Sequence, residues 1–378
     1  MLLLSWRDTG NPEGGGAEVY LEQMAAGLVA RGAKVTLMSA AYPGAPTDET
    51  DSAHPGLRYL RRGDKLTVYL RGMWLLASRQ LGRVDAVVDV QNGLPFFSRL
   101  VTRRPVVVLV HHVHREQWPV VYPGLRGRIG WLLESRVAPW LYRHCQYVAV
   151  SRATRAELEQ LGVGADRIAI VHNGTAARDT GEPSVAKTAY PSVCVVGRLV
   201  PHKRVEHAVN AVVRLRERVP GVRLTIVGSG WWEHNLREYV RALGAEDVVE
   251  FTGFVDDERK QEVYARSWLM ALPSLKEGWG LVIGEAARHD TPTVAYRSAG
   301  GTRESILDGV SGLLVDDEDE FVEAIERVLT DAGLRAELAM GARTHSGGYT
   351  WQGSQQSFAD VVSAALRGEI VAETDAVD

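Results

Sequence analysis

The sequence predicts an α/β protein built from two doubly wound domains in tandem. Three observations support this prediction: the length of 378 residues, the alternation of short β-branched segments with longer helical ones, and one interruption of that alternation near the middle. Such alternation is typical of βαβ units, in which successive strands lie parallel in one sheet. Hydrophobic residues make up 45% and charged residues 24%, which are ordinary fractions for a globular protein and exclude a disordered or fibrous chain.

Short apolar segments rich in Val, Ile and Leu are the predicted strands of the first half. They lie at residues 2–6, 34–39, 86–90, 106–111, 147–150 and 168–172. A helix is predicted at residues 17–31, since apolar residues recur there with helical spacing and Gly32 follows as a stop signal. These elements predict an N-terminal domain over residues 1–178.

The alternation stops over residues 179–191, a stretch of Thr, Gly, Pro, Ser and Lys whose composition is typical of a linker. A second set of strands is then predicted at residues 192–196, 223–227, 248–252, 269–272 and 293–296. The C-terminal domain is therefore expected to span residues 192–350. A last helix is expected at residues 351–370, followed by an acidic tail at residues 371–378.

The composition also indicates the cellular compartment of the protein and the charge of a binding partner. Cys145 and Cys194 are the only cysteines, too few for a disulfide framework or a thiolate metal site. No apolar segment has membrane-spanning length and no signal peptide is evident, so we expect a cytoplasmic protein. Residues 1–180 carry 22 Lys and Arg against 16 Asp and Glu. This basic half either favours an anionic partner, such as a phosphate-bearing acceptor or the inner face of a membrane, or reflects a drift in surface composition.

Residues 122–143 combine basic and apolar side chains. The basic ones are Arg126, Arg128, Arg136 and Arg143, and they lie among Leu, Ile and Trp. Such a segment either covers the core of its own domain or lies peripherally on an anionic bilayer. We favour the core and keep the membrane as the alternative.

A glycine-rich loop runs from Asp8 to Glu18, between the first predicted strand and the first helix. Open α/β sheets bind ligands at this position. Gly14, Gly15 and Gly16 let a ligand approach the backbone closely, and N–H groups at a helix N-terminus suit a phosphate or a diphosphate. The alternative is an ordinary glycine-rich turn. The spacing does not match the dinucleotide-binding fingerprint.

A second candidate anion site is the segment from Gly197 to Arg204, after the first strand of the second half. Arg198 offers a rigid fork for phosphate oxygens, and Lys203 adds a compact charge. The alternative is a set of scattered surface cations, but the placement on a strand-to-helix loop favours function. Gly228 and Gly230, after the next strand, are expected to form a structural turn.

The most informative segment runs from Ser274 to Ala286, from the end of a strand into an apolar helix. Glu277 lies on the predicted loop, and Glu285 lies about two turns into the helix. Carboxylates accept hydrogen bonds from sugar or ribose hydroxyls and can act as acid or base. Glu285 has apolar neighbours, so its burial is costly unless the carboxylate is used or paired.

These motifs, in this order, resemble the GT4 group of retaining glycosyltransferases, whose GT-B fold consists of two Rossmann-like domains facing each other across a cleft. Further matching segments are Val150-Ser151, Asn173-Gly174, Val227-Gly228-Ser229-Gly230, Thr252-Gly253-Phe254-Val255, Gly300-Gly301-Thr302-Arg303-Glu304 and Gly309-Val310-Ser311-Gly312-Leu313-Leu314-Val315. Each motif is weak alone, but together they cover nearly the whole chain.

The resemblance implies a metal-independent, retaining transfer of a sugar from a UDP- or GDP-linked donor. The acceptor, which is a lipid, a glycan or a small molecule, is not identified by the sequence. Neither a metal, another cofactor nor a nucleic acid is expected to bind. A sugar-nucleotide epimerase and a non-catalytic sugar-nucleotide-binding protein on the same fold remain as alternatives.

The resemblance also implies roles for single residues of the second domain. Arg198 and Lys203 would neutralise the diphosphate, Glu285 would hold the ribose hydroxyls, and Glu277 would position the donor sugar. The backbone that follows Glu277 would line the same pocket. It comprises Gly278, Trp279, Gly280 and Leu281.

In the first domain, the resemblance implies that Gly15 and Gly16 approach the diphosphate when the cleft closes, and that the last helix packs back on this domain. The family also places a histidine at the end of the strand at residues 106–111. His111 fits that register best, with His112 and His114 as substitutes. A metal site built on these histidines lacks a supporting cluster of Asp, Glu or Cys.

Overall fold

The computed structural model describes residues 1–176 and 185–372, which form two compact units. Unit 1 comprises Met1–Asn173 and the chain from Trp351 onward, and unit 2 comprises Gly174–Thr350. The expected linker at residues 179–191 and the expected tail at residues 371–378 both lie partly outside the described residues.

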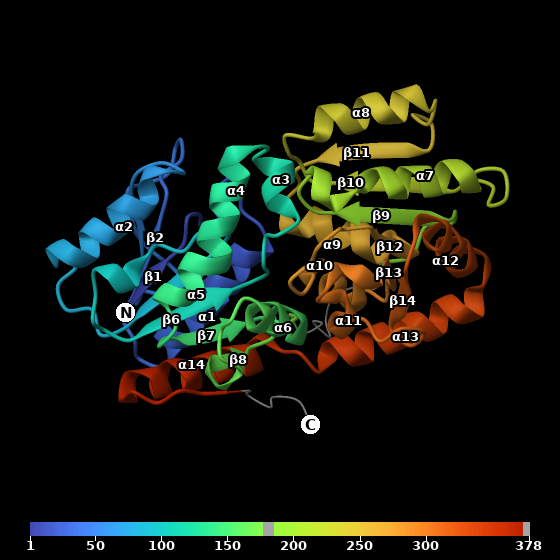
Figure 1. The fold of residues 1–378 in the computed structure, drawn as a ribbon. Coiled ribbons are helices and arrows are strands. Elements are labelled where there is room, and N and C mark those ends of the chain that lie inside the picture. The colour runs from blue at the N-terminus through green and yellow to red at the C-terminus, as the bar shows by residue number, and fades with distance from the viewer. Residues whose placement is uncertain (177–184, 373–378) are drawn as a thin grey trace. The chain divides into compact units, whose positions relative to one another are not determined.

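Unit 1 is built around an eight-stranded sheet in the order β3-β4-β2-β1-β5-β6-β7-β8 (Figure 1). The strands are β1 Leu2–Leu4, β2 Val35–Ser39, β3 Asp48–Thr50, β4 Leu57–Arg61, β5 Val87–Gln91, β6 Val106–Val110, β7 Gln146–Ala149 and β8 Ile168–Ile170. All pairs are parallel except that of β3 with β4 at the edge. The strands predicted for this half are confirmed with shifted ends. β3 and β4 were not predicted, because β3 is fully exposed and β4 carries two arginines.

Helices cover both faces of this sheet. They are α1 Gly16–Ala30, α2 Thr67–Ser78, α3 Gln117–Val121, α4 Leu125–Leu132, α5 Ala138–Leu141, α6 Arg152–Gln160 and α14 Trp351–Arg367, with short turns η1 Ser98–Leu100, η2 Leu133–Val137 and η3 Ala165–Arg167. Residues of α2, α5 and α6 share one core with strand residues such as Leu4 and Val108. The last helix packs on α1, where Gly27 leaves room for Gln355: a Cβ at Gly27 would lie 2.6 Å from that side chain.

Unit 2 contains a six-stranded, fully parallel sheet in the order β11-β10-β9-β12-β13-β14. The strands are β9 Ser192–Val196, β10 Arg223–Val227, β11 Val249–Gly253, β12 Leu269–Leu272, β13 Thr293–Tyr296 and β14 Gly312–Val315. The helices are α7 Val205–Leu215, α8 Glu233–Ala242, α9 Asp257–Arg266, α10 Leu281–Arg288, α11 Thr302–Ser305, α12 Glu318–Thr330 and α13 Ala332–Gly347, with short turns η4 Pro201–Lys203 and η5 Arg297–Ala299.

The predicted fold class is confirmed, because each unit is a doubly wound, Rossmann-like α/β structure. In each sheet the strand order reverses at an internal point: between β1 and β5 in unit 1, and between β9 and β12 in unit 2. Open α/β sheets bind ligands at the carboxyl ends of the strands beside such a point.

Among the described helices, none is long and apolar enough to cross a membrane.

Candidate active site

The carboxyl ends of β9 and β12 place the two main candidate segments of unit 2 side by side. Residues 197–204 follow β9 and residues 273–280 follow β12, and these strands are paired neighbours. The N–H of Leu275 donates to the carbonyl of His202 at 2.8 Å, which ties the two loops together. Both loops therefore lie at the edge where open α/β sheets generally bind ligands.

Lys203 and Glu277 form the central contact of this edge. Lys203 Nζ lies 2.5 Å from Glu277 Oε1, and the two side chains are 23% and 11% exposed. Since water screens a partly buried pair less than a surface pair, the attraction between these charges is strong. Arg198 is half-buried earlier in the same loop as Lys203. The structure therefore brings together a cation and a carboxylate that the sequence placed in separate motifs.

The turn after β13 fixes the loop that carries Glu277. The N–H of Glu277 donates to the carbonyl of Ala299 at 2.7 Å, and the N–H of Gly301 donates to the carbonyl of Glu277 at 3.0 Å. A Cβ at position 301 would lie 2.1 Å from the carbonyl oxygen of Gly278, so this close approach requires glycine. The backbone of Glu277 is thus held through both its N–H and its carbonyl by the turn after β13.

The segment from Gly278 to Leu281 turns the chain into α10. The Trp279 ring is buried and meets the Tyr349 ring at 4.7 Å. Gly280 has a φ of 89°, a left-handed conformation that favours glycine, and Leu281 begins the helix. The Trp279 side chain therefore packs inside unit 2 and supports the turn into α10. That the backbone from Gly278 to Leu281 lines the donor pocket stays a prediction.

Glu285 is paired with α9 rather than with Lys203. Its carboxylate accepts hydrogen bonds from Lys260 Nζ at 3.1 Å and from the Tyr264 hydroxyl at 2.9 Å. Burial and the neighbouring Glu285 raise the pKa of Tyr264 well above its usual value, so its hydroxyl stays a donor. Burial acts to lower the pKa of Lys260, but Glu285 and Asp257 outweigh it and the pKa is raised. Glu285 is therefore held by two donors that the sequence did not reveal.

Gly228 and Gly230 form a structural turn packed against the loop after β9, as expected. A Cβ at position 228 would lie 2.0 Å from the carbonyl oxygen of Gly197, and a Cβ at position 230 would lie 2.2 Å from that of Leu199. The N–H of Leu199 in turn donates to the carbonyl of Ser229 at 2.9 Å. These two glycines therefore support the loop that carries Arg198 and Lys203.

In unit 1, the glycine-rich loop is organised by a buried ion pair between Arg7 and Glu18. Arg7 Nε donates to Glu18 Oε1 at 3.0 Å, and Glu18 Oε2 accepts the N–H of Gly15 at 2.7 Å. Both charged side chains are almost fully buried. Gly15 therefore donates its N–H within the loop, while Gly16 begins α1, where the first N–H groups have no acceptor inside the helix.

His111 directly follows β6 and is 7% exposed. Its ring meets that of Tyr20 of α1 edge-on at 5.3 Å, so the first turns of α1 and the end of β6 lie together. Burial, with a smaller contribution from His114, lowers the pKa of His111 to about 3, so the imidazole is neutral near pH 7. Among the described residues, its buried Nε2 has no hydrogen-bond partner.

His112 and His114 are engaged with side chains of the same unit. The nitrogens of His114 lie 3.1 Å from Glu134 Oε1 and 2.9 Å from Asn92 Oδ1, and His112 Nε2 lies 3.1 Å from the Gln117 amide nitrogen. Glu134 is fully buried in η2, a π-helical turn between α4 and α5, and also accepts the N–H of His114. Glu134 thus anchors the loop that follows His111, a role that no sequence pattern indicated.

Two family models together cover most of the chain. The model Glycosyltransferase Family 4 matches residues 14–177, and the model Glycosyl transferases group 1 matches residues 179–345. A GDP-mannose-dependent alpha-(1-6)-phosphatidylinositol monomannoside mannosyltransferase from Mycolicibacterium smegmatis is 30% identical, over 88% of this chain and 90% of the relative. The chain belongs to the GT4 glycosyltransferases. A D-inositol 3-phosphate glycosyltransferase from Xylanimonas cellulosilytica is 29% identical over 95% of this chain and 94% of that protein.

Solved structures place this GT4 protein in the GT-B fold. Sucrose-phosphate synthase from Thermosynechococcus elongatus superimposes with a TM-score of 0.81 at 19% identity, covering 97% of this chain and 99% of that one. Anabaena HepE in complex with UDP-glucose gives a TM-score of 0.74 at 20% identity, covering 96% and 99%. At these identities the likeness concerns the fold alone.

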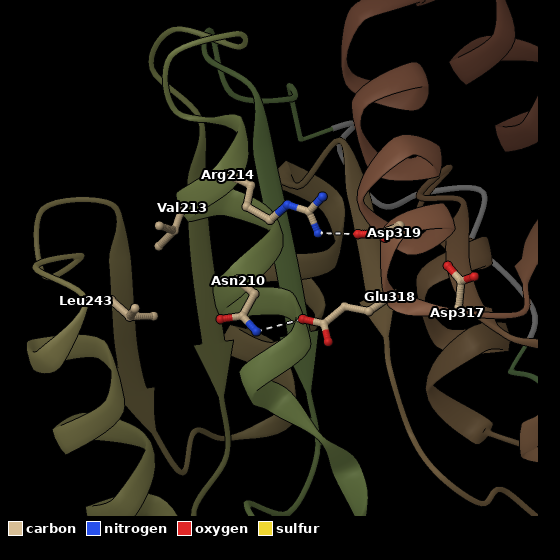
Figure 2. Close-up of a pocket in the computed structure, with 7 residues that line it drawn as sticks. All are labelled: Asn210, Val213, Arg214, Leu243, Asp317, Glu318 and Asp319. Atoms are coloured by element: carbon tan, nitrogen blue, oxygen red, sulfur yellow. Dashed lines mark hydrogen bonds and ion pairs between the residues drawn. The ribbon is translucent and has the colours of Figure 1, made fainter.

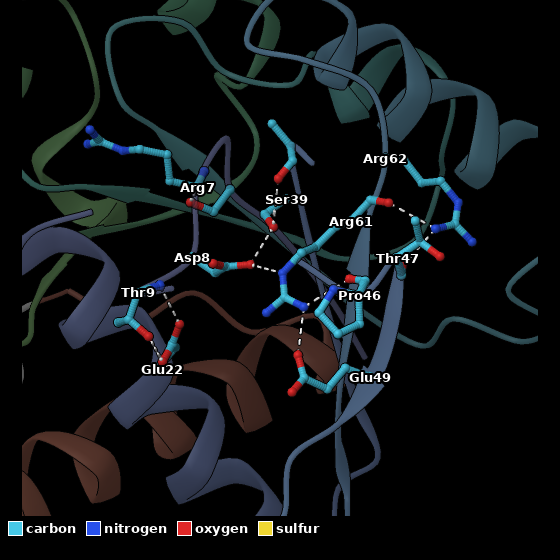
Figure 3. Close-up of polar contacts among 12 residues, drawn as sticks. Arg7, Asp8, Thr9, Glu22, Ser39, Pro46, Thr47, Glu49, Arg61 and Arg62 are labelled. Atoms are coloured by element: carbon cyan, nitrogen blue, oxygen red, sulfur yellow. Dashed lines mark hydrogen bonds and ion pairs between the residues drawn. The ribbon is translucent and has the colours of Figure 1, made fainter. Parts of the chain in front are cut away.

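A second polar network of the GT4 protein joins the ends of β1, β2 and β4 (Figure 3). Asp8 Oδ2 accepts hydrogen bonds from Ser39 Oγ at 2.8 Å and from Arg61 Nε at 2.6 Å. Arg61 also donates to Glu49 Oε2 at 2.6 Å. Thr9, next along the chain, donates to Glu22 of α1 through its N–H and its hydroxyl. These contacts fix the start of the glycine-rich loop, and β4, which supplies Arg61, was not predicted.

A pocket of unit 2 lies beside α7 and α12 and holds none of the residues predicted to bind the donor (Figure 2). Its polar groups are engaged with one another: Asn210 donates to Glu318 at 2.7 Å and Arg214 donates to Asp319 at 2.8 Å. Across residues 1–176 and 185–372, no three or more His, Cys, Asp or Glu side chains are grouped so as to hold a metal ion.

Proposed function

We propose that this GT4 protein is a retaining, metal-independent glycosyltransferase that moves a sugar from a UDP- or GDP-linked donor to an acceptor, which is a lipid, a glycan or a small molecule. The observation that carries the proposal is the Lys203–Glu277 pair at the switch point of unit 2, with Arg198 in the same loop. A nucleoside-diphosphate sugar has the complementary chemistry, since its diphosphate suits the cations and its hydroxyls suit the carboxylate.

Donor binding would exchange the partners of Lys203. In the structure its ammonium is neutralised by Glu277. A diphosphate carries more negative charge than one carboxylate and would compete for Lys203 together with Arg198. Glu277 would then turn its oxygens to the hydroxyls of the donor sugar. Glu285, oriented by Lys260 and Tyr264, would accept hydrogen bonds from the ribose hydroxyls.

Bond cleavage leaves negative charge on the departing nucleoside diphosphate. Arg198 and Lys203 would stabilise that charge, and fixed cations of this kind supply a large share of catalysis because they need little reorganisation. The leaving phosphate would take the proton of the acceptor hydroxyl on the same face of the sugar, which retains the anomeric configuration. That Gly15, Gly16 and His111 approach the donor stays a prediction.

The relatives guide the choice of donors to test. One relative is named as GDP-mannose-dependent, and one solved structure of the same fold holds UDP-glucose. For this chain we propose action in the cytoplasm, where both cysteines, which are unpaired and buried, would stay reduced. Because a ligand that binds the folded state raises its thermal stability, a thermal-shift screen of UDP- and GDP-sugars would identify the donor.

The decisive experiment follows the fate of that donor. A retaining glycosyltransferase releases free nucleoside diphosphate, and with an acceptor its product keeps the anomeric configuration of the donor by NMR, whereas an inverted product would contradict retention. An epimerase would instead give a new sugar nucleotide without free diphosphate, and a binding protein would give neither product. Turnover that EDTA does not change would support metal independence, and turnover that EDTA stops would contradict it.

A further inference from the structure

Helix α2 carries apolar side chains on two opposite faces. Val68 and Leu75 are buried in the core of unit 1. Leu66, Leu70 and Trp74 are 79%, 68% and 51% exposed. Their spacing of four residues keeps them on one side of the helix. The buried apolar face is enough to pack the helix against the core, so folding does not require a second, solvent-exposed apolar face.

The helix formed by α4, η2 and α5 also buries one side and exposes large apolar residues on another. Ala138 and Glu134 are buried, whereas four large apolar residues along the helix point outward. These are Leu125, Ile129, Leu132 and Trp140, which are 71%, 49%, 55% and 64% exposed. Residues 122–143 therefore cover the core, as we favoured from the sequence, and also present an apolar outer surface.

Both helices cover the same face of the unit 1 sheet. Val68 of α2 and Ala138 of α5 belong to one core cluster, together with Val108 of β6. The turn η1 contacts α2 and adds Leu100, which is also exposed. The exposed apolar side chains of α2, η1, α4 and α5 thus belong to the layer of helices that covers this face of the sheet. We call this layer the outer face.

The charge around the outer face is strongly positive. Residues 65–145 contain twelve Lys and Arg but four Asp and Glu, and two of those acids, Asp89 and Glu134, are fully buried. Arg128 and Arg136 are exposed among the apolar residues of the α4–α5 helix. Long basic side chains can extend from an apolar surface to reach charged groups beside it.

We propose that the outer face binds peripherally to an anionic phospholipid bilayer. Exposed Leu, Ile and Trp would enter the boundary between headgroups and acyl chains, and the surrounding arginines would pair with lipid phosphates and carboxylates. Burial of the outer face against a second copy of the chain is less favourable, because a symmetric dimer would bring two positive surfaces together. The proposal does not depend on the proposed function, since binding is measured without donor or acceptor.

Flotation of the full chain with lipid vesicles tests this proposal. The protein should float with vesicles of phosphatidylcholine and phosphatidylserine but not with phosphatidylcholine alone, and added salt should weaken the binding. Leu70→Ser and Trp74→Ser should each weaken it about tenfold, as expected for removal of one inserted apolar side chain. Arg128→Gln and Arg136→Gln should each weaken it about fivefold.

Matched variants in unit 2 serve as controls. Trp231, Met340 and Arg216 are exposed there, so Trp231→Ser, Met340→Ser and Arg216→Gln should leave vesicle binding unchanged. Circular dichroism should show that all variants fold. Absence of binding by the wild-type protein, or equal losses in the control variants, would overturn the proposal. A dimer that Trp74→Ser dissociates, with no vesicle binding, would assign the outer face to self-association instead.

Discussion

Lys203 Nζ and Glu277 Oε1 are 2.5 Å apart although the residues are 74 positions apart in the chain. The pair forms because β9 and β12 are neighbours in the sheet and release their loops at the same edge. Both side chains are partly buried, so removal of either one alone would leave the other charge uncompensated and would lower the free energy of unfolding. A ligand with a diphosphate and hydroxyl groups would replace this single contact by several.

Replacing Glu277 should stop catalysis and spare nucleotide binding. We expect Glu277→Ala to lower kcat by about a hundredfold or more, because the donor sugar loses its positioning carboxylate. Affinity for the free nucleoside diphosphate should stay equal or rise, since Lys203 then has no competing anion. The exposed carboxylate of Glu258 provides a control, and Glu258→Ala should behave as wild type. Turnover of Glu277→Ala at the wild-type rate would remove this residue from the site.

Loss of either cation should weaken nucleotide binding. A charge-assisted hydrogen bond contributes about 1.5–3 kcal/mol, so Arg198→Ala and Lys203→Ala should each raise the Kd for the nucleoside diphosphate about tenfold or more. Arg216→Ala, a change to an exposed arginine elsewhere in unit 2, should have no such effect. Calorimetry would measure all three. Unchanged Kd values for both site variants would contradict the assignment of the diphosphate to this loop.

The role of Glu285 can be tested with a modified ligand. If its carboxylate accepts ribose hydroxyls, the wild-type protein should bind a deoxyribonucleoside diphosphate less tightly than the ribonucleotide. Glu285→Ala should bind both with similar affinity. Tyr264→Phe, which removes one donor to Glu285 at 2.9 Å, should reduce the discrimination only in part. Persistence of full discrimination in Glu285→Ala would place the ribose elsewhere.

His111 should make the folded state sensitive to acid. Its pKa falls to about 3 on folding, from an unfolded value of about 6.5. Between about pH 3 and about pH 6.5, the imidazole of His111 binds a proton in the unfolded chain but not in the folded chain. The free energy of unfolding therefore decreases as the pH falls below about 6.5, by at most about 1.4 kcal/mol per pH unit. The fall in Tm between pH 7 and pH 5 should therefore be smaller in His111→Gln than in the wild type. His54→Gln, at a more exposed site, should leave that fall nearly unchanged. An equal fall in His111→Gln and the wild type would contradict the buried, neutral imidazole.

Gly230→Ala should lower stability and nucleotide affinity together. The new Cβ would lie 2.2 Å from the carbonyl oxygen of Leu199, so the loop that carries Arg198 must move. We expect a loss of about 1–3 kcal/mol, as for other overpacked sites. Gly347→Ala is the matched control, because a Cβ there meets no atom within 4 Å and helical alanine is favourable. Denaturation and calorimetry would measure the two effects, and a Gly230→Ala protein with wild-type stability would show that this contact is readily relieved.

The sequence by itself determined the doubly wound class, most strands and the loops that carry Arg198, Lys203 and Glu277. These features are encoded locally, because apolar periodicity and strand-to-helix turns involve residues close together in the chain. The exposed β3 and the arginine-bearing β4 were not predicted, since their pairing depends on neighbouring strands more than on their own composition. The four-residue β14 is apolar and buried but was not predicted either.

Only the tertiary structure decided which groups meet. Lys203 pairs with Glu277, Lys260 with Glu285, Arg61 with Asp8, and His114 with Glu134. Each pair joins residues brought together by packing of separate elements, and sequence spacing carries no record of such a contact. The tertiary structure likewise decided that Gly15 donates its N–H to Glu18, that α2 buries one apolar face and exposes another, and that α4 exposes Leu125, Ile129 and Leu132. The physical reason is the same throughout. The sequence shows which side chains are apolar or charged, and its periodicity shows which of them share a face of a helix or strand. The partner of each side chain depends on which surfaces the folded sheet and helices place against each other.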